Sequence, residues 1–149
     1  MSLIGVNNIL VLNVLLFLAL ASYQDIKEKK VFRSFPYSMV AVFWIVQIAF
    51  GSVFSLSFWL LTIPIFFGYL FVGYLFKKIM NWGFADTTMF SALGLILPSL
   101  GLHVAFLQVF IVGLLVYPIT YNLALKKSWK EKVPLIPMFL IAFLISLII

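Results

Sequence analysis

All ten basic residues of this 149-residue chain fall in three short segments, and the stretches between those segments are almost entirely apolar. Hydrophobic residues make up 65% of the chain and charged residues only 9%. A helix needs about 20 predominantly apolar residues to cross the ~30 Å hydrocarbon core of a bilayer, and several stretches approach that length. The sequence therefore predicts an all-α integral membrane protein.

The apolar pattern predicts six transmembrane helices. The linkers between them are too short to hold a separate soluble domain, so residues 1–149 are expected to form a single transmembrane domain. The expected spans are residues 3–24, 37–54, 56–76, 85–100, 104–125 and 134–149.

The basic residues also predict the orientation of these spans. Four lie within residues 25–36, two are Lys77 and Lys78, and four lie within residues 126–132. The linkers near Ser55 and Gly101 carry none. Because basic residues accumulate in cytoplasmic loops, the first, third and fifth linkers are expected in the cytoplasm and both termini outside. Membrane topology thus accounts for the net charge of +6, and no nucleic-acid partner is expected.

The chain has only two aspartates, and this topology places both at cytoplasmic ends of spans. Asp25 ends the first span and Asp86 opens the fourth. Taken alone, Asp25 reads as a solvated interfacial charge, and Asp86 as a cap of a helix N-terminus. The fourth span, at roughly 16 residues or ~24 Å, is short for the bilayer, which favours partial burial of Asp86. Burial would raise the pKa of its carboxyl.

Gly83-Phe84-Ala85-Asp86 at the start of a short span, preceded by Asp25-Ile26 and a basic stretch, resembles the type IV prepilin and preflagellin (archaellin) peptidases. These are membrane aspartyl proteases of the GxGD type. The resemblance covers the six spans, the order of the two aspartates and the tract from Asp86 to Pro98. It implies that Asp25 and Asp86 are the catalytic pair, with Gly83 and Ala85 as supporting motif positions.

The chain departs from the family pattern at three places. Ala85 replaces the second glycine of the motif, Thr88 stands where a lysine is common, and Phe32-Arg33 replaces a Pro-Asn pair. These substitutions leave both aspartates intact and bear on substrate preference and activity. The four-cysteine insert that accompanies N-methylation in bacterial members is missing, because the chain has no cysteine. The resemblance is therefore to the archaeal, peptidase-only form, without methyltransferase activity.

The resemblance implies an endopeptidase of the cell membrane that acts at the cytoplasmic face without a metal or other cofactor. Its partners would be pilin-like or archaellin precursors, whose short basic leader is cut just before an apolar helix. Two carboxyls in one site share a proton, so one activates water while the other protonates the carbonyl oxygen of the substrate. Glu28 is the candidate for binding the basic leader, although pairing with neighbouring lysines is the simpler interpretation.

Two other functions fit the same pattern. Acidic residues at one face of six short spans also suit a small proton- or cation-coupled transporter. Such transporters normally hold their charged site near the midplane and often contain an internal repeat, which the sequence does not show. A catalytically inactive scaffold of the same fold is the third possibility.

Residues outside the motif give weaker expectations. Tyr121 and Asn122 lie near the cytoplasmic end of the fifth span, where packing is the simplest role and an approach to the aspartates is the alternative. His103 is expected on the outer side. The four tryptophans are expected to face lipid or the membrane interface.

Overall fold

The computed structural model describes residues 3–28, 31–80, 82–125 and 133–149, and within these ranges the chain is helical, without strands. The expected all-α class is confirmed. The elements are α1 (Leu3–Glu28), α2 (Ser34–Ala49), the short 3-10 helix η1 (Ser52–Phe54), α3 (Leu56–Ile79), α4 (Phe84–Leu100), α5 (His103–Ala124) and α6 (Ile136–Ser146). Each expected span corresponds to one of the six α-helices. The first continues about one turn beyond Asp25, which therefore lies inside α1.

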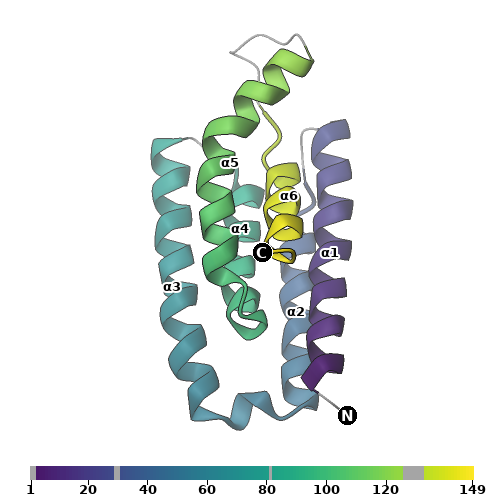
Figure 1. Cartoon of the computed structure of the whole chain (residues 1–149), viewed down its shortest axis with the longest axis vertical. Coiled ribbons are helices and arrows are strands. Elements are labelled where there is room, and N and C mark those ends of the chain that lie inside the picture. The colour runs from purple at the N-terminus through teal and green to yellow at the C-terminus, as the bar shows by residue number, and fades with distance from the viewer. Residues whose placement is uncertain (1–2, 29–30, 81, 126–132) are drawn as a thin grey trace.

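Successive helices alternate in direction, so the linkers between them gather at two ends of the bundle (Figure 1). The basic residues that the structure describes are Lys27, Arg33, Lys77 and Lys78. They occupy the last turns of α1 and α3 and the residue before α2, which all lie at one end, called here the basic end. The six remaining lysines lie at positions 29–30 and 126–132, outside the described residues, as does Glu131. The separation of linkers expected from charge is thus confirmed for the described part of the chain.

Three helices are long and apolar enough to cross a membrane, namely α1, α3 and α5. Helices α2, α4 and α6 are apolar but shorter. With 11 residues, α6 extends only ~16 Å from the basic end, and the C-terminus lies partway along the bundle (Figure 1). The start of α1 lies at the opposite end. The helices indicate a membrane protein, with three of the six expected spans long enough to meet the length of a transmembrane helix.

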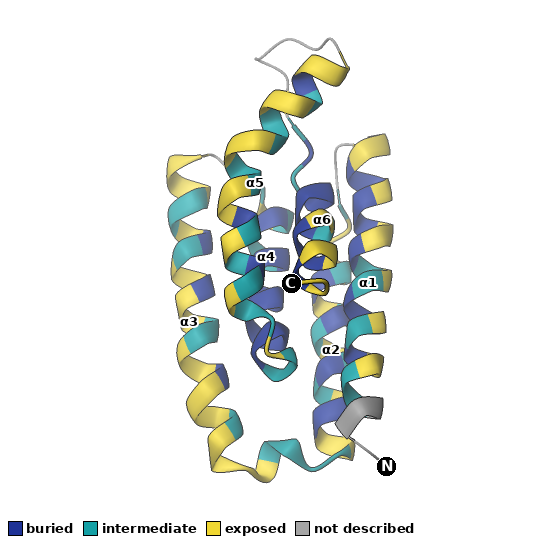
Figure 2. Cartoon of the chain, viewed as in Figure 1, coloured by how far each residue is buried: buried dark blue, intermediate teal, exposed yellow. Residues whose placement is uncertain are grey.

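Helix α4 forms the centre of the bundle, because it contacts each of the other five α-helices. Every residue from Met89 to Pro98 is buried, whereas α3 and α5 expose apolar side chains on their outer faces (Figure 2). Leu115 on α5, for example, is 71% exposed. An apolar exterior around a packed interior is the arrangement expected in lipid. Since protein encloses α4, its short length does not require a thinner bilayer.

Small residues bring α3 and α4 close together. A Cβ atom added to Gly94 would overlap Cβ and Cγ of Tyr69, so the tyrosine lies directly on the glycine backbone. Nearer the basic end, a Cβ on Gly73 would lie 3.4 Å from Cγ2 of Thr87 and 3.7 Å from Oγ of Ser91. Close helix contacts of this kind are typical of membrane proteins, where van der Waals packing replaces the hydrophobic effect between helices.

Trp82, in the linker before α4, is an exception to the expected placement of tryptophans, because it is only 5% exposed. Its ring packs against aromatic rings from four helices, with centroid distances between 4.8 and 5.9 Å. The expectation that all four tryptophans face lipid is therefore wrong. The buried ring anchors the linker that leads into Asp86. The rings around Trp82 are those of Phe76, Phe90, Phe110 and Phe139.

Candidate active site

Asp25 lies in the last turn of α1, is only 7% exposed, and contacts the start of α6. Its Oδ2 atom accepts a hydrogen bond from the backbone N–H of Ile136 at 3.2 Å. Helix α6 cannot provide this acceptor itself, because the side chain of Leu135 at the N-cap has no oxygen. Pro137 carries no N–H, and the N–H of Met138 bonds to the carbonyl of Leu135. Asp25 therefore caps α6 from another helix.

Asp86 lies in the first turn of α4 and is 6% exposed. Its Oδ2 atom accepts the backbone N–H of Gly83 at 3.0 Å, so the carboxyl reaches back over the start of its own helix. The reciprocal bond of a full capping box is impossible, since Gly83 has no side chain. The expectation that Asp86 caps a helix is therefore confirmed. Gly83 has φ −66° and ψ 160°, a conformation open to any residue, so the backbone here does not require glycine.

Both carboxyls lie at the basic end of the bundle, in similar surroundings. Both are buried, both accept a backbone N–H at a helix N-terminus, and they lie on α1 and α4, which pack against each other. The interpretation of Asp25 as a solvated surface charge is wrong. Burial of Asp86, expected from a short span, is confirmed, but its cause is the enclosure of α4 by other helices. A helix N-terminus favours an ionised carboxyl, typically by 0.3–1 kcal/mol, which partly offsets the cost of burial.

Further polar side chains lie near the end of α5. The ring centroid of Tyr117 lies 5.9 Å from that of Tyr121. Asn122 is 4% exposed, and its Oδ1 atom has no hydrogen-bond partner within the described part of the chain. The same is true of the buried Oγ of Ser22, three residues before Asp25 on α1. The sequence pointed to Tyr121 and Asn122 but missed Tyr117, whose spacing of four residues from Tyr121 puts both on one helix face.

Glu28 lies at the end of α1 and is exposed. Its Oε2 atom accepts a hydrogen bond from Nε2 of Gln24 at 3.5 Å, and Oε1 of Gln24 accepts the backbone N–H of Phe32 at 2.9 Å. These bonds tie the linker after α1 back onto the helix. Lys29 and Lys30, the expected partners of Glu28, lie outside the described residues.

The first residue of α4, Phe84, is held by cations from two other elements. The Arg33 guanidinium lies 5.1 Å from the ring centroid and the Lys77 ammonium 5.8 Å. Each contact contributes about 0.5–1 kcal/mol at an exposed site. The two neighbours of Gly83 are therefore both held in place. Phe84 contacts cations at the surface, and Trp82 packs among buried aromatic rings.

The arrangement suits acid–base chemistry. Two buried carboxyls at one end of a helical bundle each accept a backbone N–H. Among the described residues, no three His, Asp or Glu side chains gather in a group that would hold a metal ion. His103, at the start of α5, lies at the end of the bundle opposite the aspartates.

Fold and site together define a membrane-type helical protein with an acidic pair at one end. The model of the type IV leader peptidase family matches residues 12–118, a segment that contains both aspartates and the whole of α4. The chain therefore belongs to the type IV leader peptidase family, and the resemblance seen in the sequence is confirmed. No curated protein and no solved structure matches the chain.

Proposed function

We propose that this protein is an aspartyl endopeptidase that cleaves the leader of type IV pilin-like or archaellin precursors at the cytoplasmic face of the cell membrane. Membership of the type IV leader peptidase family supports the peptidase class. The observation that carries the catalytic assignment is the burial of the only two aspartates at one end of the bundle, on contacting helices.

The chemistry proposed for the pair follows from electrostatics. Two neighbouring carboxyls in a medium of low dielectric constant do not both ionise, so the pair holds one proton, which belongs to both groups. The ionised carboxyl takes a proton from a water molecule as that water attacks the scissile carbonyl. The protonated carboxyl donates to the carbonyl oxygen, and the tetrahedral intermediate then collapses. Gly83 and Ala85 position Asp86 through the first turn of α4.

We place the two aspartates on the cytoplasmic side of the membrane because of the basic residues around them. The described basic residues lie at the end that carries the aspartates, and basic loops are retained in the cytoplasm. A transporter is less well supported, because a transport site normally lies near the midplane and these carboxyls lie in terminal helix turns. An inactive scaffold of the same fold differs from a peptidase only in activity.

Cleavage of a precursor by the purified protein in detergent tests the proposal. We expect the parental protein to remove the leader and the Asp25→Asn and Asp86→Asn variants to retain the full-length precursor. Asparagine keeps an oxygen acceptor for the capped N–H, so these variants should stay folded. Parental cleavage by either variant would contradict the proposal, and ion flux without cleavage would favour the transporter.

Recognition of the basic leader by Glu28 has its own test. Its exposed carboxylate already accepts a bond from Gln24, and exposed ion pairs contribute little, typically below 1 kcal/mol. We expect Glu28→Lys to change KM for a basic-leader substrate by less than about twofold. A tenfold increase in KM with the same kcat would instead establish Glu28 as a leader-binding residue.

A further inference from the structure

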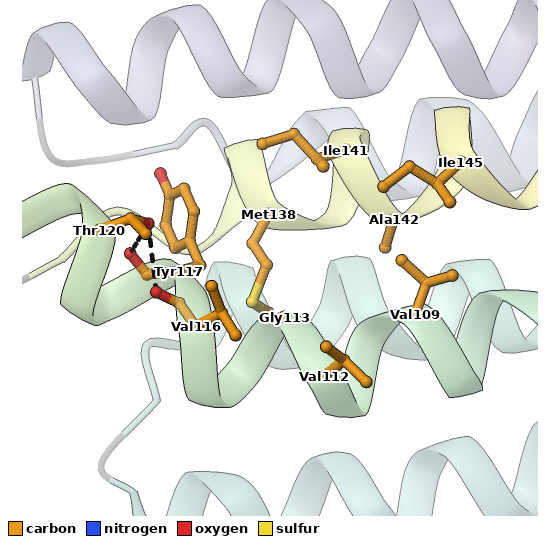
Figure 3. Close-up of a pocket in the computed structure, with 10 residues that line it drawn as sticks. All are labelled: Val109, Val112, Gly113, Val116, Tyr117, Thr120, Met138, Ile141, Ala142 and Ile145. Carbon is orange, nitrogen blue, oxygen red and sulfur yellow. Dashed lines mark hydrogen bonds between the residues drawn. The ribbon is translucent and has the colours of Figure 1, made fainter.

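An apolar groove runs between α5 and α6 on the outside of the bundle. Its volume is about 280 Å³, and along α5 it extends from Val109 to Thr120, a length of ~17 Å at the rise of an α-helix (Figure 3). The side chains that line it are largely aliphatic, and Gly113 forms part of its floor, opposite Met138. Such a groove accepts the side chains of an apolar helix lying alongside it.

Two polar residues, Tyr117 and Thr120, line the groove. Both lie at the end of the groove where α6 begins. The Thr120 hydroxyl donates to the carbonyls of Val116 and Tyr117, at 3.1 and 3.0 Å, so α5 itself satisfies this donor (Figure 3). Tyr117 extends beside the start of α6, where the backbone N–H of Ile136 donates to Oδ2 of Asp25. On α6 the lining begins at Met138, two residues after Ile136, so the groove leads from the lipid-facing surface to the helix start that Asp25 caps.

Two further cavities lie away from the start of α6. A second apolar groove of about 240 Å³ lies between α3 and α5, but on α5 it involves only His103 and Leu107, near the opposite end. A third cavity of about 280 Å³ is lined by Asn7, Gln47 and Ser99, and it also lies away from the aspartates. Among these three, only the α5–α6 groove ends beside the helix start that Asp25 caps.

We propose that the α5–α6 groove binds the apolar helix that follows the cleavage site of the precursor, with Tyr117 marking the point where substrate passes from the groove to Asp25. The inference rests on the proposed peptidase function and adds the surface on which the substrate lies. The apolar lining matches a hydrocarbon-rich helix, and the polar end matches the start of that helix, where the scissile peptide bond lies. Binding from the lipid side also lets a membrane-inserted precursor enter laterally.

Adjacent residues of α5 provide a matched pair of variants. Val116 lines the groove and is 50% exposed, whereas Leu115 is 71% exposed and is not part of its lining. We expect Val116→Trp to fill the groove and raise KM for the full-length precursor about tenfold relative to KM for a short peptide that lacks the apolar helix. Leu115→Trp should leave this ratio unchanged. Equal ratios in the two variants would overturn the groove assignment, although the proposed peptidase function would stand.

Photo-crosslinking provides a readout that does not depend on cleavage. A precursor with a diazirine side chain in its apolar helix would be illuminated with the Asp86→Asn variant, and the crosslinked residues identified by mass spectrometry. We expect adducts on Val112, Val116 or Ile141, all of which line the groove. Adducts confined to α3, or to residues outside the groove, would overturn the assignment. Cleavage during this experiment would instead contradict the proposed role of Asp86, so the two failures are distinguishable.

Discussion

The Oδ2 atom of Asp25 accepts the backbone N–H of Ile136 at 3.2 Å, so a carboxyl near the end of the first helix caps the last helix, 111 residues later in the chain. Asp86 similarly accepts the N–H of Gly83 at the start of α4. Both proposed catalytic groups therefore also hold the ends of helices. A variant that removes the oxygen acceptor would lose structure and chemistry together, and this double role determines which substitutions are informative.

Substitution of Asp25 should separate these two roles. Asp25→Ala leaves the Ile136 N–H without an acceptor in a buried position, which is expected to cost about 0.5–2 kcal/mol, as for other lost helix caps. Asp25→Asn keeps an acceptor and should lose less than half as much. Thermal unfolding in detergent measures the difference. If both variants unfold at the same temperature, the capping bond does not contribute to stability.

The proximity of the two aspartates is testable because the chain contains no cysteine. We expect the Asp25→Cys/Asp86→Cys double variant to be joined by a short bifunctional thiol reagent, since the proposed pair must share one water molecule. The control is Asp25→Cys/His103→Cys, because His103 lies at the opposite end of the bundle. Mass spectrometry detects the internal crosslink. Equal yields from the two pairs would show that the aspartates are not adjacent.

Trp82 should be among the most sensitive positions outside the acidic pair. Its buried ring fills a space between four aromatic side chains, and removing such a side chain typically costs 3–5 kcal/mol. We expect Trp82→Ala to lower the unfolding temperature strongly and to reduce cleavage by displacing the entry to α4. Trp59, which is 36% exposed, is the matched control. A comparable drop in the unfolding temperature of Trp59→Ala would mean that the burial of Trp82 does not explain its sensitivity.

Two glycines should respond oppositely to alanine. At Gly94 the new Cβ would overlap Cβ and Cγ of Tyr69, so α3 and α4 must separate, and overpacking of this kind costs about 1–3 kcal/mol. At Gly68, on the same pair of helices, nothing lies within 4 Å of the new Cβ. Gly68→Ala should leave stability unchanged or raise it slightly, since alanine favours a helix. The unfolding temperatures of the two variants in one detergent test this contrast.

Much of this architecture could be predicted from the position of charges. Basic residues that cluster in alternate linkers predict which helix ends lie together, and the described ones do share one end. Asp25 and Asp86 were placed at that end by the same reasoning. The predicted end of the first helix, at residue 24, was too early. The last turn of α1 contains Lys27 and Glu28, so the apolar pattern does not extend to the end of the helix.

The residues that complete the site could not be predicted in this way. The bond from Ile136 to Asp25 depends on how α6 packs against α1, and no local pattern records contacts between segments so distant in the chain. Trp82 was misplaced because tryptophans near the ends of apolar segments usually lie at the membrane interface. Its burial arises from the aromatic side chains of four helices, which only the assembled bundle brings together.

The most direct test of the account is a double-mutant cycle on the cleavage of a precursor. We predict that Asp25→Asn and Asp86→Asn each lower kcat/KM by at least about a thousandfold, and that the double variant is no worse than either single variant, because residues that act as one catalytic unit are not additive. Near-parental activity in either single variant, or losses that multiply in the double variant, would contradict a shared aspartyl pair.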